Sequence, residues 1–131
     1  MARFFGKKFY RFLAKNFGKT PADFKQIPVI INNYNRLSTL KQLISDLETR
    51  GYTNLYIIDN KSTYPPLLEY YENECTYKVF RLRKNIGFKA LWKSGIWYKF
   101  FTGYYCYTDS DLSLIEDCPD DFMQRFYKLL Q

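Results

Sequence analysis

The chain has 131 residues and a formal net charge of +7, and 47% of its residues are hydrophobic and 21% aromatic. This length suits one domain with a buried core, and the apolar content argues against a disordered chain. The sequence has no histidine and only three cysteines, none in Cys-x-x-Cys spacing, which excludes Ser-His-Asp and Cys-His catalysis and leaves oxygen ligands for any metal.

Residues 1–26 are predicted to form a basic helical arm and a linker. Seven Lys and Arg residues and one Asp lie in this segment, so it holds most of the net charge. Phe5, Phe9 and Phe17 recur at helical spacing within residues 3–17, and the basic side chains fall largely on the other side. Such a helix can lie on an anionic membrane surface, or its aromatic face can pack on its own domain or on a second subunit.

Residues 27–131 are predicted to form one α/β domain. Four apolar runs rich in β-branched or aromatic residues are predicted strands: residues 27–32, 55–59, 77–82 and 104–108. Four segments are predicted helices: residues 38–50 with Ser38 or Thr39 as cap, 65–74, 88–101, and from 120 or 121 to the end. The alternation indicates a Rossmann-like, mainly parallel sheet with flanking helices.

A polar segment follows each predicted strand. The four segments are Asn33–Arg36, Asp59–Ser62, Lys84–Gly87 and Asp109–Asp111. Right-handed crossovers bring the carboxyl ends of parallel strands to one edge of the sheet, where ligands bind. We therefore expect these segments to converge in space.

Asp109-Ser110-Asp111 is the candidate metal site. Two carboxylates two residues apart, just past a strand, can share Mg²⁺ or Mn²⁺, which in turn stabilises a diphosphate leaving group. An Asp-x-Asp pair also occurs by chance and often caps a helix. The metal interpretation therefore depends on the position of this pair at the end of a predicted strand.

The other polar segments each allow two interpretations. Asp59 can accept hydrogen bonds from a base or ribose, or it can begin a turn with Asn60. Asn33, Tyr34 and Arg36 can contact a base and phosphates, or they can form a plain polar loop. The Asn85-Ile86-Gly87 segment is either part of the same site or a simple turn.

The order of these motifs resembles that of the family 2-like glycosyltransferases with the GT-A fold. That family has a strand with a Tyr-Asn-Arg-like loop, a strand ending in Asp-Asn-x-Ser, an Asn-x-Gly stretch with a later Gly, and a strand ending in Asp-x-Asp. Four segments in the same order carry the resemblance, which covers about residues 27–118: residues 30–36, 57–62, 85–95 and 107–111.

The resemblance implies a nucleotide-sugar site and a role for each matching residue. Tyr34 and Arg36 would lie near the nucleotide, with Asn33 beside them, and Asp59 would bind the base, usually uracil. The sugar-nucleotide pocket would be lined by Asn85, Gly87 and Lys89. Asp109 would reach the ribose or the metal, and Asp111 would bind Mn²⁺ or Mg²⁺ directly.

The resemblance leaves the acceptor half of the reaction unassigned. Family members are usually much longer, and their second half supplies the acceptor pocket and, in inverting enzymes, a carboxylate base. This chain ends 20 residues after Asp111, and Asp117, Asp120 and Asp121 do not match that base. We expect donor binding here. The chain would be either a truncated domain or a minimal family member whose acceptor site comes from elsewhere, and an acceptor that is lipid-linked or part of a polysaccharide would suit a membrane-bound arm.

Other functions remain open at this point. A non-catalytic nucleotide-binding or membrane-surface protein could keep the same half fold. A nucleotidylyltransferase would show a Gly-rich phosphate loop after the first strand, and residues 33–36 lack that glycine pattern. Nucleic-acid binding would need more positive charge on residues 27–131, which are nearly neutral. The unpaired cysteines and the lack of an apolar run of about 18 residues favour a cytoplasmic protein, peripheral on the inner membrane face if residues 3–17 bind lipid.

Overall fold

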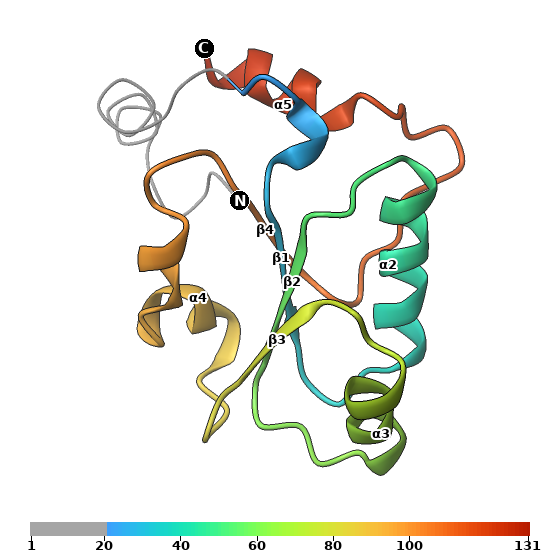
Figure 1. Ribbon diagram of the computed structural model, residues 1–131, viewed down its shortest axis with the longest axis vertical. Helices are drawn as coiled ribbons and strands as arrows, with labels where there is room; N and C mark the ends of the chain where they lie inside the picture. The colour runs from blue at the N-terminus through green and yellow to red at the C-terminus, as the bar shows by residue number, and fades with distance from the viewer. Residues whose placement is uncertain (1–20) are drawn as a thin grey trace.

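The computed structural model describes residues 21–131, which form a four-stranded parallel sheet between two helical layers (Figure 1). The strands are β1 Val29–Asn33, β2 Leu55–Asp59, β3 Lys78–Arg81 and β4 Cys106–Asp109. Their order is β3-β2-β1-β4, and all three pairings are parallel. The predicted Rossmann-like α/β fold is thereby confirmed, and the predicted arm at residues 3–17 lies outside the described residues.

The helical segments divide between the two faces of the sheet. The helices are α2 Ser38–Thr49, α3 Pro65–Asn73, α4 Ala90–Lys93 and α5 Phe122–Leu130, with 3-10 turns η2 Phe24–Gln26, η3 Gly87–Lys89 and η4 Ile96–Lys99. In Figure 1, α2 and α3 lie on one side of the sheet and α4 on the other, while α5 lies near the start of β1. Among residues 21–131, no helix has the length and hydropathy needed to cross a bilayer.

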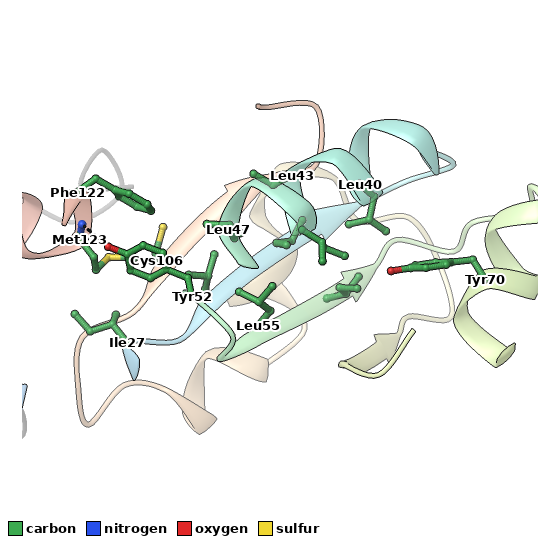
Figure 2. Packing of buried hydrophobic residues seen from close by; sticks show 14 of the residues in the cluster. Ile27, Leu40, Leu43, Leu47, Tyr52, Leu55, Tyr70, Cys106, Phe122 and Met123 are labelled. Atoms are coloured by element: carbon green, nitrogen blue, oxygen red, sulfur yellow. Dashed lines mark hydrogen bonds between the residues drawn. The ribbon is translucent and has the colours of Figure 1, made fainter. Parts of the chain in front are cut away.

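The larger core lies between the sheet and α2. Alternate residues of a strand point to opposite faces, so Ile31 and Ile57 face α2, whose Leu40, Leu43 and Leu47 form the opposing apolar stripe (Figure 2). Burial of such side chains is the main favourable term in folding. At the end of this core, Tyr52 packs against Phe122 with ring centroids 4.6 Å apart, which fixes α5 to the domain.

The second core lies under α4. Ile30 and Ile58 point to this face, where they meet Ala90 and Leu91 of α4. Tyr107 of β4 closes the layer, because its hydroxyl donates a 2.9 Å hydrogen bond to the Phe88 carbonyl. The segment after β3 is therefore tied to the sheet by both apolar and polar contacts.

Two local predictions were wrong. The helix predicted over residues 88–101 is broken into η3, α4 and η4, and the break falls at Gly95, whose φ is 82°. That left-handed conformation favours glycine and ends a helix. The α2 cap also differs: Leu37 is the N-cap, without a side-chain hydrogen bond, and Ser38 is the first helical residue.

We predict that Leu40→Ala lowers the free energy of unfolding by about 2–5 kcal/mol, since it leaves a cavity in a packed core. Leu40 is 0% exposed and is the first residue of the α2 stripe. Ser45→Ala on the exposed side of the same helix is the control, with an expected change within about 0.5 kcal/mol. Urea denaturation followed by circular dichroism measures both, and equal losses would contradict the packing described here.

Candidate functional site

The buried polar residues gather at the carboxyl edge of the sheet. Among residues 21–131, six polar or charged side chains are buried, and each lies at or just after the end of β1, β2 or β4: Asn32, Asn33, Asp59, Asn60, Ser62 and Ser110. Buried polar groups need hydrogen-bond partners, so this edge must hold a connected network. The predicted convergence of the β1, β2 and β4 segments is present in the structure.

A chain of hydrogen bonds crosses this edge from β4 to β2. The Ser110 hydroxyl donates to Asn33 Oδ1 at 2.6 Å. Asn33 Nδ2 donates to the Tyr71 hydroxyl at 2.8 Å, and that hydroxyl donates to Asp59 Oδ1 at 2.9 Å. Tyr71 comes from α3, so one helix and three strands are joined by four side chains, which we call the relay.

Asp59 is the anchor of the relay. It is 0% exposed, and its second oxygen, Oδ2, accepts from the Ser62 backbone N–H at 2.9 Å and lies 3.5 Å from Arg81 Nε. Both carboxylate oxygens thus have protein partners. Burial raises the pKa of Tyr71 above its ordinary value, which keeps its hydroxyl protonated as the donor to Asp59.

A second network holds the loop after β3. Asn60 Nδ2 donates to Asn32 Oδ1 at 2.7 Å and to the Gly87 carbonyl at 3.0 Å, and Asn60 Oδ1 accepts from the Ile86 N–H at 3.1 Å. Asn85 Oδ1 accepts from the Gly87 N–H at 2.9 Å. Gly87 has φ 77°, a conformation that glycine adopts without strain. The Asn85–Gly87 turn is therefore fixed against β1 and β2.

The loops after β1 and β2 are joined around Asn35. This residue has φ 52°, and its Oδ1 accepts from the N–H groups of Thr63 and Tyr64 at 2.7 and 3.0 Å. The Ser62 hydroxyl accepts from the Asn35 N–H at 2.8 Å. Beside these joined loops lies an open hollow of about 440 Å³, lined by Asn35, Arg36, Leu37, Ser38, Thr39, Lys41 and Tyr64.

The two carboxylates of Asp109-Ser110-Asp111 lie on the outside of the turn. Asp109 and Asp111 are exposed whereas Ser110 is 2% exposed, so the middle residue is held inward by Asn33 while its neighbours face solvent. Arg36 Nη2 lies 3.9 Å from Asp111 Oδ2, and both side chains are about half exposed. Residues predicted from the first and last polar segments therefore meet at this turn.

The remaining predicted site residues lie at the surface. The side chain of Tyr34 is 48% exposed, and Asn85 is exposed apart from its bond to Gly87. Lys89 is exposed, and its Nζ lies 5.8 Å from the centre of the Phe88 ring. The structure thus brings Asn33, Arg36, Asp59 and the Asp109–Asp111 turn together. Within residues 21–131, no side-chain hydrogen bond or ion pair joins Tyr34 or Lys89 to them.

Two residues of this edge, Tyr71 and Arg81, lie outside every polar segment singled out from the sequence. Tyr71 lies on α3, where Tyr70 beside it is the core residue, so no periodicity marks its hydroxyl. Arg81 is the last residue of β3 and reads as an ordinary exposed strand residue. Ser110 was part of the motif, but its inward orientation follows from the pairing of β4 with β1, because alternate residues face opposite ways.

Comparisons with known proteins support the fold. No family model matches the chain, and no curated protein matches it significantly. A solved structure, residues 1–349 of TarS from S. aureus, is similar with a TM-score of 0.52 and 18% identity over 79% of this chain. TarS is a GT-A glycosyltransferase. At this identity the likeness shows a shared fold, and the match spans 32% of the TarS chain.

We predict that Tyr71→Phe lowers the free energy of unfolding by about 1–3 kcal/mol, because buried Asp59 and Asn33 each lose a partner. The effect depends on pH. A raised pKa in the folded state stabilises the fold fully below the ordinary tyrosine pKa of about 10, and this stabilisation is lost as the pH rises above it. Urea denaturation from pH 8 to pH 11 should therefore show a smaller alkaline loss in Tyr71→Phe than in the parent.

The control for this prediction is Tyr98→Phe. The Tyr98 side chain is 65% exposed, so removing its hydroxyl should leave both the stability and its pH dependence unchanged. Identical alkaline profiles for the parent and Tyr71→Phe would show that the relay does not depend on the protonated hydroxyl.

Proposed function

We propose that this chain binds a nucleotide sugar, with UDP as its nucleotide, and a divalent cation at Asp109 and Asp111, and that it is the donor-binding part of a glycosyltransferase. The observation that carries the proposal is the Asp109–Asp111 turn. Its two carboxylates face solvent, and the serine between them points inward and is hydrogen-bonded to Asn33. The turn lies at the carboxyl edge of a sheet whose fold is similar to that of TarS. Ligands of open α/β sheets bind at this edge.

The residues present suit a metal that is shared with a phosphate ligand. Among residues 21–131, no group of three acidic or cysteine side chains could hold a metal by itself. Mg²⁺ usually keeps several waters and is bound by one or two carboxylates together with substrate phosphates. Asp109 and Asp111 would supply those carboxylates, and the ion would neutralise charge on a departing diphosphate.

The nucleotide would lie against the loops after β1 and β2. The hollow beside them has the cations Arg36 and Lys41 and the ring of Tyr64, which is 45% exposed. A diphosphate pairs with cations and a base stacks on an aromatic ring, so both parts of a nucleoside diphosphate have partners here. Tyr34, on the loop after β1, is a second exposed ring.

Asp59 and the Asn85 loop have different parts in this proposal. Direct contact between Asp59 and a base stays a prediction, and it requires Asp59 to exchange a bond to Tyr71 or Ser62. In the arrangement seen here, Asp59 orients the loop through Ser62. Asn85, Gly87 and Lys89 would line the sugar side of the donor, where the fixed turn at Gly87 presents backbone rather than a side chain.

Sugar transfer needs more than donor binding. In a direct displacement, an acceptor hydroxyl oxygen bonds to the anomeric carbon, the bond from that carbon to the diphosphate oxygen breaks, and UDP leaves with the electron pair. The hydroxyl proton passes to a base, which stays unassigned in this chain. A non-catalytic nucleotide-binding protein is the alternative, and it would share the binding but not the turnover.

We predict that UDP binds more tightly with Mn²⁺ than without it, and that Asp111→Asn weakens the Mn²⁺-dependent binding by about tenfold or more, because even residues that only orient a metal ligand change metal affinity by about 10- to 100-fold. UDP is the probe because the sugar is not assigned. Titration calorimetry measures both affinities, and Asp117→Asn is the matched control, since Asp117 is an exposed carboxylate further along the same loop. Equal UDP affinity in both variants would contradict the assigned metal site.

A further inference from the structure

Charge is segregated within the described part of the chain. Residues 76–108 contain seven Lys and Arg residues and no Asp or Glu, whereas the other described residues contain seven basic and thirteen acidic ones. Four of those acidic residues lie on α2 and α3, which cover one face of the sheet, whereas α4, from the basic segment, covers the other face (Figure 1). The domain is nearly neutral as a whole but has a basic side.

The basic side is formed by residues 87–101, which we call the α4 layer. It contains Lys89, Lys93 and Lys99, all exposed, and no acidic residue. The buried side of the layer is Ala90, Leu91, Ile96 and Phe100. Because those residues face the sheet, the three lysines project from the other side. Lys78 of β3 adds a fourth charge at its margin, where its Nζ lies 5.5 Å from the Phe80 ring centre.

A cluster of aromatic rings accompanies these lysines. Trp97 and Tyr98 lie with ring centroids 4.1 Å apart, and Phe101 lies 5.7 and 5.8 Å from them. Tyr98 is 65% exposed and Phe88 58%. Trp97 and Phe101 are partly buried, and Trp97 also packs against the second core. A single exposed ring is ordinary at a protein surface, but an exposed ring packed on two partly exposed ones beside several lysines forms a larger apolar patch that indicates an interaction surface.

We propose that the α4 layer docks on an anionic lipid surface, with Trp97, Tyr98 and Phe101 in the interfacial region and Lys93 and Lys99 on lipid phosphates. Amphipathic aromatic rings settle at the level of lipid headgroups, and lysines beside them are attracted to acidic lipids. Lys93, Lys99 and the three rings are not among the residues assigned to the donor site, so the proposal does not rest on the proposed function.

The chemistry favours lipid over nucleic acid. The cations of the α4 layer are all lysines, which act as point charges, whereas arginine is the usual residue for reading phosphates and bases in nucleic acid. The three rings also pack on one another. They therefore form one compact apolar cluster, whereas proteins that bind single-stranded nucleic acid have separate rings on which successive bases stack.

The tryptophans allow a local test of this proposal. The sequence has two, Trp92 and Trp97, so Trp92→Phe leaves Trp97 as the single reporter within the patch. We expect a blue shift of Trp97 emission when the full chain meets vesicles of equimolar phosphatidylglycerol and phosphatidylcholine, and quenching when the lipids carry brominated chains. Phosphatidylcholine vesicles alone should give neither change.

Charge variants separate this surface from the basic arm of residues 1–26. In the Trp92→Phe background, Lys93→Glu with Lys99→Glu should weaken vesicle binding by about tenfold or more, because each lysine near an anionic surface contributes about fivefold. Lys61→Glu with Lys128→Glu has the same net charge and changes exposed lysines outside the α4 layer, so its binding should stay near that of the parent. Circular dichroism shows whether each variant is folded.

Several results would overturn the proposal. Vesicle binding without quenching of Trp97 would assign the membrane contact to another part of the chain. No vesicle binding, or binding of single-stranded nucleic acid in its place, would also reject it. A blue shift that appears with protein concentration alone, together with a dimer in light scattering, would identify a second copy of the chain as the occupant.

Discussion

A carboxylate with no solvent contact stands at the end of β2, and the surrounding edge of the sheet is built to accommodate it. Removing a charge from water is costly unless it is paired and hydrogen-bonded. Asp59 meets this requirement through Tyr71, the Ser62 backbone and Arg81. These partners come from α3, from the loop after β2 and from β3, so satisfying one side chain fixes three segments of the chain.

The same requirement reaches β4 through Asn33. Its amide is 1% exposed and has a donor and an acceptor group to satisfy, and it uses Tyr71 on one side and Ser110 on the other. Because Ser110 is drawn inward, Asp109 and Asp111 must turn outward. The exposed carboxylates are therefore positioned by the buried groups beneath them, which is how a site can be orderly although its own side chains are exposed.

The elements with strong local patterns could be predicted from the sequence. The residues of β2 were predicted at both ends, and α2 was placed correctly because Leu40, Leu43 and Leu47 mark one face. The helix after Gly87 was predicted too long, since the aromatic-rich pattern continues through Gly95 although the backbone turns there. The place of Asp109 and Asp111 at the sheet edge followed from chain order alone. The relay could not be predicted, because Tyr71 meets Asn33 only through the packing of α3 on the sheet. No periodic pattern in the sequence marks that contact.

The position of β4 has a consequence for how such a domain can change over evolution. Among residues 21–131 the strand order is β3-β2-β1-β4, so β4 is an edge strand that pairs with β1 on one side, and its last residue is Asp109. The relay runs from Ser110 toward β1 and β2, away from that edge. Further strands can therefore be added beside β4 without breaking a bond of the relay. Sequences can therefore vary in the segments that lie beside Asp109 and Asp111 while they keep the relay that holds these two residues. The neighbouring segments and the relay are free to diverge at different rates.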